Sequence, residues 1–384
     1  MVRVAGIDPG TASFDIVVMD DGYIVEEKSI PTPEVARDPS LVTESLREYG
    51  RLDAVAGPSG YGVPVTPNKD IVDPRRFGVE VLLLSTEEQI AEGIAAGELG
   101  IMVYQALADI VVEMWKSKLP VYYIPGVIHL PTVELHRKLG RLDMGTADKM
   151  ALTLLAVHTY SRSKGIDPRE AEFMVLELGY GYNALTVVKK GRIVDGLGGT
   201  ICCKGFLTHG PLDLEHAVMG GSWRRSDVFY GGVSTVSGKT NPLDAWKDWM
   251  RGEEPSYSIV ESMLEDLERT VYGMAKLHGV RRILLSGRLS RINEIRSSVL
   301  ERLGELDVES LPLLDGAKTS KEAAQGYALI MDGLLGGRYS HITDMNMLME
   351  AKGTVLDYAV HPRLVEARRR LVEAYKSSVR NPKL

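Results

Sequence analysis

The sequence predicts an α/β protein with two domains built from one duplicated unit. The chain has 384 residues, which is too long for one ordinary hydrophobic core and suits two domains. Residues 6–25 read as strand, glycine-rich turn, strand, turn and strand, and residues 176–194 repeat that order without a gap. Apolar strand patterns followed by helical patterns come after both copies. This order is typical of an α/β fold.

The two copies correspond residue by residue. Gly10 in the first glycine-rich turn corresponds to Gly179 in the second, and the acidic Asp8 corresponds to the acidic Glu177. Because only two copies exist and they lie half a chain apart, we interpret them as a duplicated domain and not as a solenoid repeat.

Composition and charge exclude several classes of partner. Hydrophobic residues make up 44% of the chain and charged residues 25%, which is typical of a globular protein. The net charge of -7 provides no basic surface for a nucleic acid or an anionic membrane, so we expect neither as a partner. No apolar run approaches the roughly 20 residues of a membrane helix. We therefore expect a cytoplasmic protein.

The first candidate site residues follow a short strand. After a predicted helix over residues 41–49, residues 52–56 read as a buried strand that ends in the small-residue loop 57–62. Open α/β sheets bind ligands beyond the carboxyl ends of their strands, so Ser59 and Tyr61 are candidates to line a substrate pocket. A tight glycine and proline turn is the alternative explanation of this loop.

Two further candidates lie between the copies. Helical patterning over residues 87–116 is interrupted by glycines, and a buried strand over residues 121–124 then leads to His129. His129 could hydrogen-bond a substrate oxyanion, or it could be a satisfied core histidine, and both readings stay open. A long helix opens near Thr146, which would be its N-cap, with Asp148 in the first turn. Capping alone explains both residues, and a catalytic Asp148 is the alternative.

The second half repeats the strand and helix order. A glycine and proline loop after the long helix predicts a boundary between domains 1–167 and 168–384. A helix over residues 258–278 precedes a strand at 282–286, the turn Gly287-Arg288, and another helix. Backbone amides at such a helix start lie near any ligand. We also expect a C-terminal helix from about residue 362 that packs back on the first domain.

The paired turns predict a phosphate site. A strand-turn-strand with a glycine-rich turn presents backbone N–H groups to an anion, and two such turns that face each other would hold a polyphosphate from both sides. Asp8 lies just before the first turn and is a candidate ligand of Mg²⁺, which favours one or two carboxylates together with phosphate oxygens. The candidate phosphate contacts are Gly10, Thr11, Gly179, Tyr180 and Gly181.

These motifs resemble those of the actin, Hsp70 and sugar kinase superfamily. Residues 8–15 are similar to its first phosphate motif, residues 176–187 to its second, and residues 283–292 to its adenosine motif. The resemblance implies duplicated ribonuclease H-like domains, also called actin-like ATPase domains, with a nucleotide cleft between them. It also implies ATP and Mg²⁺ as cofactors, and adenosine-side contacts from Gly287 and Arg288.

Within that superfamily, the acetate and butyrate kinase branch is the most similar. The segment LELGYG at 176–181 resembles the H-L-G-N-G of these acid kinases, and residues 128–131 and 145–149 lie where they carry F-H-x-T-x-P and H-G-T-S-H. An archaeal family described as predicted butyrate kinases is the most similar overall. The resemblance implies a kinase that acts on a short-chain carboxylate, with His129 steadying the transferred phosphoryl group.

The departures from the acid kinases leave alternatives open. Pro125 stands where those enzymes have a catalytic aspartate, and Met144 replaces a histidine. The substrate-side arginines of those enzymes are also missing, because residues 56–62 contain no arginine and the GPLD of residues 210–213 stands in place of R-S-G-D. One alternative is a nucleotide-dependent switch without an acceptor. The other is a kinase that phosphorylates an alcohol, with Asp148 as the base. A homodimer is also left open.

Overall fold

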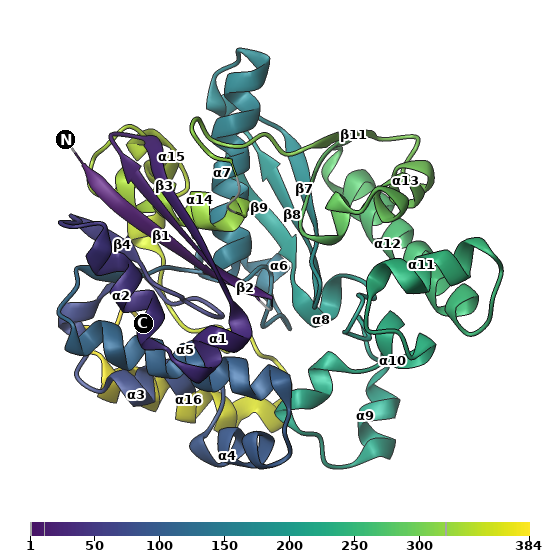
Figure 1. Cartoon of the computed structure of the whole chain (residues 1–384), viewed down its shortest axis with the longest axis horizontal. Helices are drawn as coiled ribbons and strands as arrows, with labels where there is room; N and C mark the ends of the chain where they lie inside the picture. Colours follow the sequence, from purple (N-terminus) through teal and green to yellow (C-terminus); the bar gives the residue numbers. More distant parts are fainter. Residues whose placement is uncertain (1, 11, 319–320) are drawn as a thin grey trace.

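The computed structural model describes residues 2–10, 12–318 and 321–384, and contains two β-sheets with two helices between them (Figure 1). The first sheet has the order β3-β2-β1-β4-β6-β5. Its strands are β1 (Arg3–Pro9), β2 (Ser13–Asp20), β3 (Tyr23–Pro31), β4 (Ala54–Ala56), β5 (Thr66–Pro67) and β6 (Val121–Tyr123). The second sheet has the order β11-β10-β7-β8-β9. Its strands are β7 (Phe173–Leu178), β8 (Asn183–Lys189), β9 (Arg192–Leu197), β10 (Arg282–Ser286) and β11 (Asp307–Ser310).

The two sheets share one topology. β1 pairs with β2 in antiparallel and with β4 in parallel, and β7 pairs in the same way with β8 and β10. Each sheet has one bulge in its hairpin, between Val18 and Met19 in β2 and between Val187 and Val188 in β8. These bulges lie at corresponding positions of the two sequence copies. The structure thus confirms the predicted α/β class and the duplication, including this local irregularity.

Helices cover the sheets in the predicted alternation. In the first half these are α1 (Thr32–Arg37), α2 (Ser40–Glu48), α3 (Pro74–Arg76), α4 (Glu87–Ala95), α5 (Leu99–Lys116), α6 (Leu135–Lys138) and α7 (Ala147–Lys164). In the second half they are α8 (Gly199–Cys202), α9 (Leu214–Gly220), α10 (Val233–Ser237), α11 (Pro242–Met250), α12 (Ser256–His278), α13 (Asn293–Arg302), α14 (Glu322–Leu334), α15 (Ser340–Met345) and α16 (Val365–Ser378). Among the described residues, no helix combines the length and apolar character needed to cross a membrane.

Two of these helices form the central layer. α14 packs against β1 and β2, α7 packs against β8, and the two helices pack against each other (Figure 1). Their apolar residues form one core between the sheets, while the outer faces of the sheets form separate cores with α5 and α12. Both central helices begin at the same edge, where β1 and β7 end. This arrangement brings their first turns to the duplicated glycine-rich turns.

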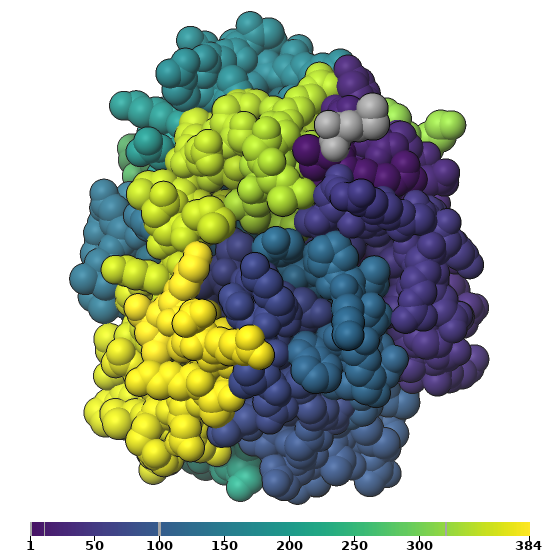
Figure 2. Space-filling view, turned by 90° about the vertical axis from the view of Figure 1, so that its left-hand side faces the viewer, coloured from purple at the N-terminus to yellow at the C-terminus, as the bar shows by residue number. Residues whose placement is uncertain are grey.

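The C-terminal part of the chain lies against the first half. β1 contacts α14, and Val379 forms a bridge with Ile71 just after helix α16, which contacts residues 77–82. Figure 2 shows the C-terminal segment, in yellow, beside the blue surface of the first half. Residues of the second half therefore cover part of the first sheet. The boundary near residue 167 stays a prediction.

The surroundings of two helical glycines predict that replacing each of them by alanine changes the stability of the protein in opposite directions. A Cβ at Gly326 in α14 would lie 2.2 Å from the Ala151 carbonyl oxygen of α7, whereas a Cβ at the exposed Gly273 in α12 would meet nothing within 4 Å. We expect Gly326→Ala to lower the free energy of unfolding by about 1–3 kcal/mol through overpacking. Gly273→Ala should raise it by about 0.5–1 kcal/mol, because alanine favours the helix. Urea midpoints followed by circular dichroism measure both changes, and a neutral Gly326→Ala would contradict the packing described.

Candidate functional site

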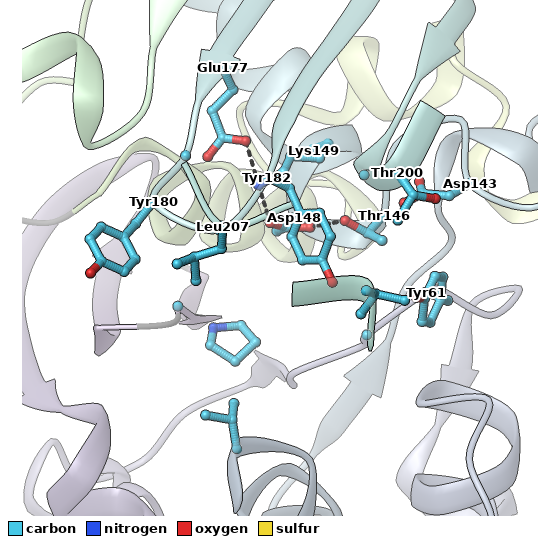
Figure 3. Close-up of a pocket in the computed structure, with 18 of the residues that line it drawn as sticks. Tyr61, Asp143, Thr146, Asp148, Lys149, Glu177, Tyr180, Tyr182, Thr200 and Leu207 are labelled. Carbon is cyan, nitrogen blue, oxygen red and sulfur yellow. Dashed lines mark hydrogen bonds and ion pairs between the residues drawn. The ribbon is translucent and has the colours of Figure 1, made fainter. Parts of the chain in front are cut away.

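A pocket of about 590 Å³ lies where the two duplicated turns meet (Figure 3). Its walls come from the turn after β1, the turn after β7, the turn after β10 and the first turns of α7 and α14. Segments from both sheets therefore share one cavity. The pocket has a side lined by the glycine-rich turns and a side lined by aromatic and apolar residues.

The two glycine-rich turns are closed in the same way. The Gly10 N–H donates to the Ser13 carbonyl at 3.0 Å, and the Gly179 N–H donates to the Tyr182 carbonyl, also at 3.0 Å. A Cβ at Gly179 would lie 2.3 Å from that carbonyl oxygen, so the close turn requires glycine. The amides of Gly10 and Gly179 are therefore occupied within the turns. The two glycines shape the pocket, and a bound phosphate would need hydrogen-bond donors other than these two amides.

Two lysines bring positive charge to the ends of these strands. At the start of α14, Lys321 Nζ lies 2.9 Å from Asp8 and 3.4 Å from Asp15. At the start of α7, Lys149 pairs with Asp148 at 2.7 Å and with Glu177. Figure 3 shows the dashed interactions that join Glu177, Lys149, Asp148 and Thr146 in one row. The corresponding acids of the two copies, Asp8 and Glu177, thus each have a lysine partner.

The ionisation of these carboxylates follows from burial and from the lysines. Burial raises the pKa of Asp8 and of Glu177, although their lysine partners oppose the shift. Burial also acts to raise the pKa of Asp148, but Lys149 and a hydrogen bond from Thr146 outweigh it, so the net shift is downward. Asp148 is therefore ionised at neutral pH, and both of its oxygens have partners. Thr146 stands at the N-cap position of α7, but its hydroxyl bonds Asp148 and caps no backbone N–H.

The other side of the pocket contains an arginine without a carboxylate partner. Arg225 begins a short 3₁₀ helix (Arg225–Phe229) and donates from Nη2 to the hydroxyl of Tyr61 at 2.6 Å and that of Tyr104 at 3.3 Å. The guanidinium also lies 5.2 Å from the centre of the Tyr61 ring. Its Nε is buried and has no hydrogen-bond partner, and Arg225 forms no ion pair within the part of the chain that the structure describes. Arg225 is thus a cation that lines the pocket without an ion-pair partner among the described residues.

A carboxylate on this side, that of Asp143, also has no ion-pair partner among the described residues. Asp143 lines the pocket ahead of α7, and its Oδ1 accepts a hydrogen bond from the Gly145 N–H at 2.8 Å. Within the described ranges it forms no ion pair with a lysine, arginine or histidine. Burial raises the pKa of Asp143 to about 6, and the nearby charge of Asp148 adds to the effect. Aromatic and apolar neighbours surround this side: Leu83, Val103, Tyr104, Leu107, Leu142, Tyr182 and Phe229.

Most of the predicted site residues line this one pocket, whatever their separation in sequence. They are Asp8, Gly10, Tyr61, Asp148, Gly179, Tyr180, Gly181, Gly287 and Arg288. Arg288 also reaches across to the Ser13 hydroxyl, at 3.3 Å, on β2 of the other sheet. Thr11 lies outside the described residues.

Two predicted residues lie in the core and not in the pocket lining. The Ser59 side chain is fully buried, donates to the Gly57 carbonyl and accepts from the Ile124 N–H. His129 is 3% exposed, and its Nδ1 accepts from the Gly126 N–H. Burial lowers the pKa of His129 to about 4, so the ring is neutral. Both residues act here as satisfied core groups, which was the alternative reading of His129.

Several residues of the pocket were not predicted as site residues from the sequence. Lys149 and Lys321 follow acid or small residues at helix starts, a pattern that fits ordinary helices as well. Asp143 precedes a predicted cap, and Arg225 lies in an irregular segment. The segments 56–62 and 210–213 contain no arginine, as stated from the sequence, but Arg225 enters the pocket from the segment between residues 213 and 232. Only tertiary folding places it opposite the turns.

The residues present fit a divalent cation that arrives with a ligand. The carboxylate of Asp8 lines the pocket, and Mg²⁺ takes one or two such groups and completes its shell with phosphate oxygens and water. Within residues 2–10, 12–318 and 321–384, no cluster of three or more acidic, histidine or cysteine side chains could hold a metal by itself. The donor set therefore suits an ion shared with a polyphosphate, with Lys321 as the present partner of Asp8.

Comparison with solved structures identifies the fold. The acetate kinase of Porphyromonas gingivalis superposes with a TM-score of 0.53 at 13% identity, covering 91% of this chain and 100% of that one. The acetate kinase of Entamoeba histolytica gives a TM-score of 0.49 at 13% identity, with coverages of 79% and 86%. The first similarity confirms the predicted fold of duplicated actin-like ATPase domains. At this identity it shows the fold alone.

Comparison of sequences identifies the family. No protein of curated function matches this sequence. A family described as "Protein of unknown function (DUF1464)" matches residues 6–361, which contain both glycine-rich turns and every lining residue of the pocket. The finer resemblance to predicted butyrate kinases stays a prediction. The chain belongs to the DUF1464 family.

Proposed function

We propose that this protein is an ATP- and Mg²⁺-dependent phosphotransferase that phosphorylates a small molecule carrying a carboxylate. The observation that carries the proposal is the position of Arg225. Its guanidinium, which has no anionic partner among the described residues, faces the same cavity as the two glycine-rich turns. A nucleotide on the turn side and an anionic acceptor on the arginine side would meet in that cavity.

The turn side supplies what phosphoryl transfer needs. This reaction depends mainly on positioning and on neutralising charge on the phosphates. Lys321, Lys149 and Arg288 provide three cations around the turns, although the chain as a whole has a net charge of -7. The acetate kinase fold supports the same use of the cleft. Bound Mg²⁺ would neutralise phosphate charge, and Asp8 is the residue that would hold it.

The arginine side supplies a carboxylate subsite. A guanidinium in a partly desolvated site loses hydration, and a carboxylate restores the lost interactions through two parallel hydrogen bonds. Arginine suits this recognition better than lysine because its donors form a planar fork. The apolar neighbours, such as Leu107 and Phe229, suit a short carbon chain. These features support a short-chain acid of the butyrate type as acceptor.

The central ion pairs fix the geometry between the two sides. Lys149 holds Asp148 and Glu177 together, so the first turn of α7 is tied to the end of β7. Because both oxygens of Asp148 have partners, this residue positions Lys149 and is a poor proton acceptor. A switch without an acceptor would leave Arg225 facing an empty cavity in every state, so we do not favour that alternative.

Loss of the arginine should abolish the response to an acid. We measure ADP release with Mg-ATP and a panel of acetate, propionate, butyrate, lactate and 3-hydroxybutyrate, and expect at least one acid to stimulate it. For that acid, Arg225→Gln should raise KM roughly 30- to 150-fold, because a charge-assisted hydrogen bond contributes about 2–3 kcal/mol. The exposed neighbour gives the control, and Arg224→Gln should leave KM unchanged. Stimulation that survives in Arg225→Gln would refute the subsite.

Loss of the first acid should remove the advantage that Mg²⁺ gives to nucleotide binding. By calorimetry, we expect Asp8→Asn to weaken Mg-ATP binding at least about tenfold, because a metal ligand is lost. ATP binding in EDTA should stay equal or become tighter, since Lys321 is then free for phosphate. Asp20→Asn, at the end of the β1–β2 pair that lies away from Asp8, is the matched control and should bind like the wild type. Equal Mg²⁺ dependence in Asp8→Asn and wild type would contradict the assignment.

A further inference from the structure

We propose that the acceptor is a hydroxycarboxylate that is phosphorylated on its hydroxyl group, with Asp143 as the general base and Arg225 as the carboxylate anchor. This inference rests on the proposed function and deepens it, because it names the reacting oxygen. The two residues reach the cavity from different parts of the chain, Asp143 from the segment before α7 and Arg225 from the irregular segment after α9.

The two charged residues line one pocket without contacting each other in an ion pair. Asp143 and Arg225 do not form an ion pair, and neither pairs with another charged side chain in the described residues. The carboxylates at the ends of β1 and β7 and at the start of α7 are instead paired, as with Lys321 and Asp8 or Lys149 and Asp148. Unpaired charges in a partly desolvated cavity are costly unless a ligand compensates them. A ligand with an anionic group and a hydroxyl donor compensates both.

The surroundings of Asp143 hold one oxygen of its carboxylate in place and leave the other oxygen available to a ligand. Oδ1 accepts from the Gly145 N–H, whereas Oδ2 accepts no hydrogen bond from the described residues. A Cβ at Gly198 would lie 2.0 Å from Oδ1, and a Cβ at Gly199 would lie 2.7 Å from Oδ2. The two glycines therefore make room for the carboxylate. Its position is set by backbone, which is the preorganisation that a base requires.

Asp143 is better suited as a base than Asp148. Both lie in the same pocket, but Asp148 accepts from Thr146 and from Lys149, and its pKa is lowered. Asp143 forms no ion pair within the described residues, and although the charges of Lys149 and Arg225 oppose the shift, burial raises its pKa to about 6. A carboxylate acceptor is already ionised at pH 7 and needs no base, whereas a hydroxyl acceptor does. The presence of an unpaired base thus favours a hydroxyl as the reacting group.

The reaction balances with these groups alone. The hydroxyl oxygen of the acceptor forms a bond to the γ-phosphorus of ATP, and the bond from that phosphorus to the β–γ bridging oxygen breaks. The electron pair leaves with ADP. The hydroxyl proton goes to Oδ2 of Asp143. The products are ADP and a phosphate ester whose free carboxylate stays on Arg225, in contrast to the acyl phosphate that a carboxyl acceptor would form.

Matched acids test which oxygen reacts. We compare butyrate with 3- and 4-hydroxybutyrate, and propionate with lactate, by ADP release with wild-type protein and Mg-ATP. We expect a hydroxy acid to exceed its parent acid at least about 100-fold, because proton transfer to a positioned base contributes 10²–10⁴-fold. Phosphorus NMR should show a phosphate ester that hydroxylamine does not consume. Equal rates with the parent acid and trapping of a hydroxamate would overturn the inference but leave the proposed function intact.

Substitution of the base tests its role separately. With the best hydroxy acid, Asp143→Asn should lower kcat at least about 100-fold, while KM for the acid and the calorimetric affinity for Mg-ATP change less than about threefold. A merely structural role would lower all three together. The control Asp307→Asn, exposed on β11, should match wild type in each. An unchanged kcat, or no stimulation by any hydroxy acid while Mg-ATP still binds, overturns the inference. If the wild-type protein does not bind Mg-ATP, the proposed function itself is refuted.

Discussion

The ion pairs of Lys149 and Lys321 are the interactions on which the geometry of the pocket depends. Each lysine joins the first turn of a central helix to the end of a hairpin strand, Lys149 to Glu177 on β7 and Lys321 to Asp8 on β1. Removing one partner of such a buried pair typically costs about 3–5 kcal/mol, because the other charge stays buried. The two helices are packed side by side, so these anchors also set how the two turns face each other.

The charged side chains on the two sides of the pocket differ in whether they form ion pairs. Near the turns, Asp8, Asp148 and Glu177 each pair with a lysine, and a bound phosphate would compete for these cations. On the far side, the hydrogen-bond partners among the described residues are two tyrosine hydroxyls and one carbonyl for Arg225, and one backbone amide for the Asp143 side chain. A preformed site of this kind gives binding energy to a ligand of matching charge and little to an apolar one. The groups that would select the acceptor thus lie outside the phosphate motifs.

Sequence reasoning was most accurate where local pattern decides the structure. The duplicated hairpin predicted the two sheets, and Gly10 and Gly179 occupy corresponding turns as expected. It was least accurate for isolated polar residues. Ser59 and His129 follow strands, where ligands often bind, yet both point into the core and bond backbone groups. A strand end is visible in the sequence, but the direction of one side chain depends on what packs against it.

The sequence by itself determined the repeat, the α/β class and the strand ends that carry Asp8 and Glu177, because alternation, glycine turns and residue spacing are local properties of the chain. Only the tertiary structure decided which groups meet. Lys321 lies more than 300 residues from Asp8, and Arg225 more than 80 from Asp143. Nothing in their local sequences distinguishes them from surface charges. They become site residues because packing of α7 and α14 between the sheets closes the two halves around one cavity.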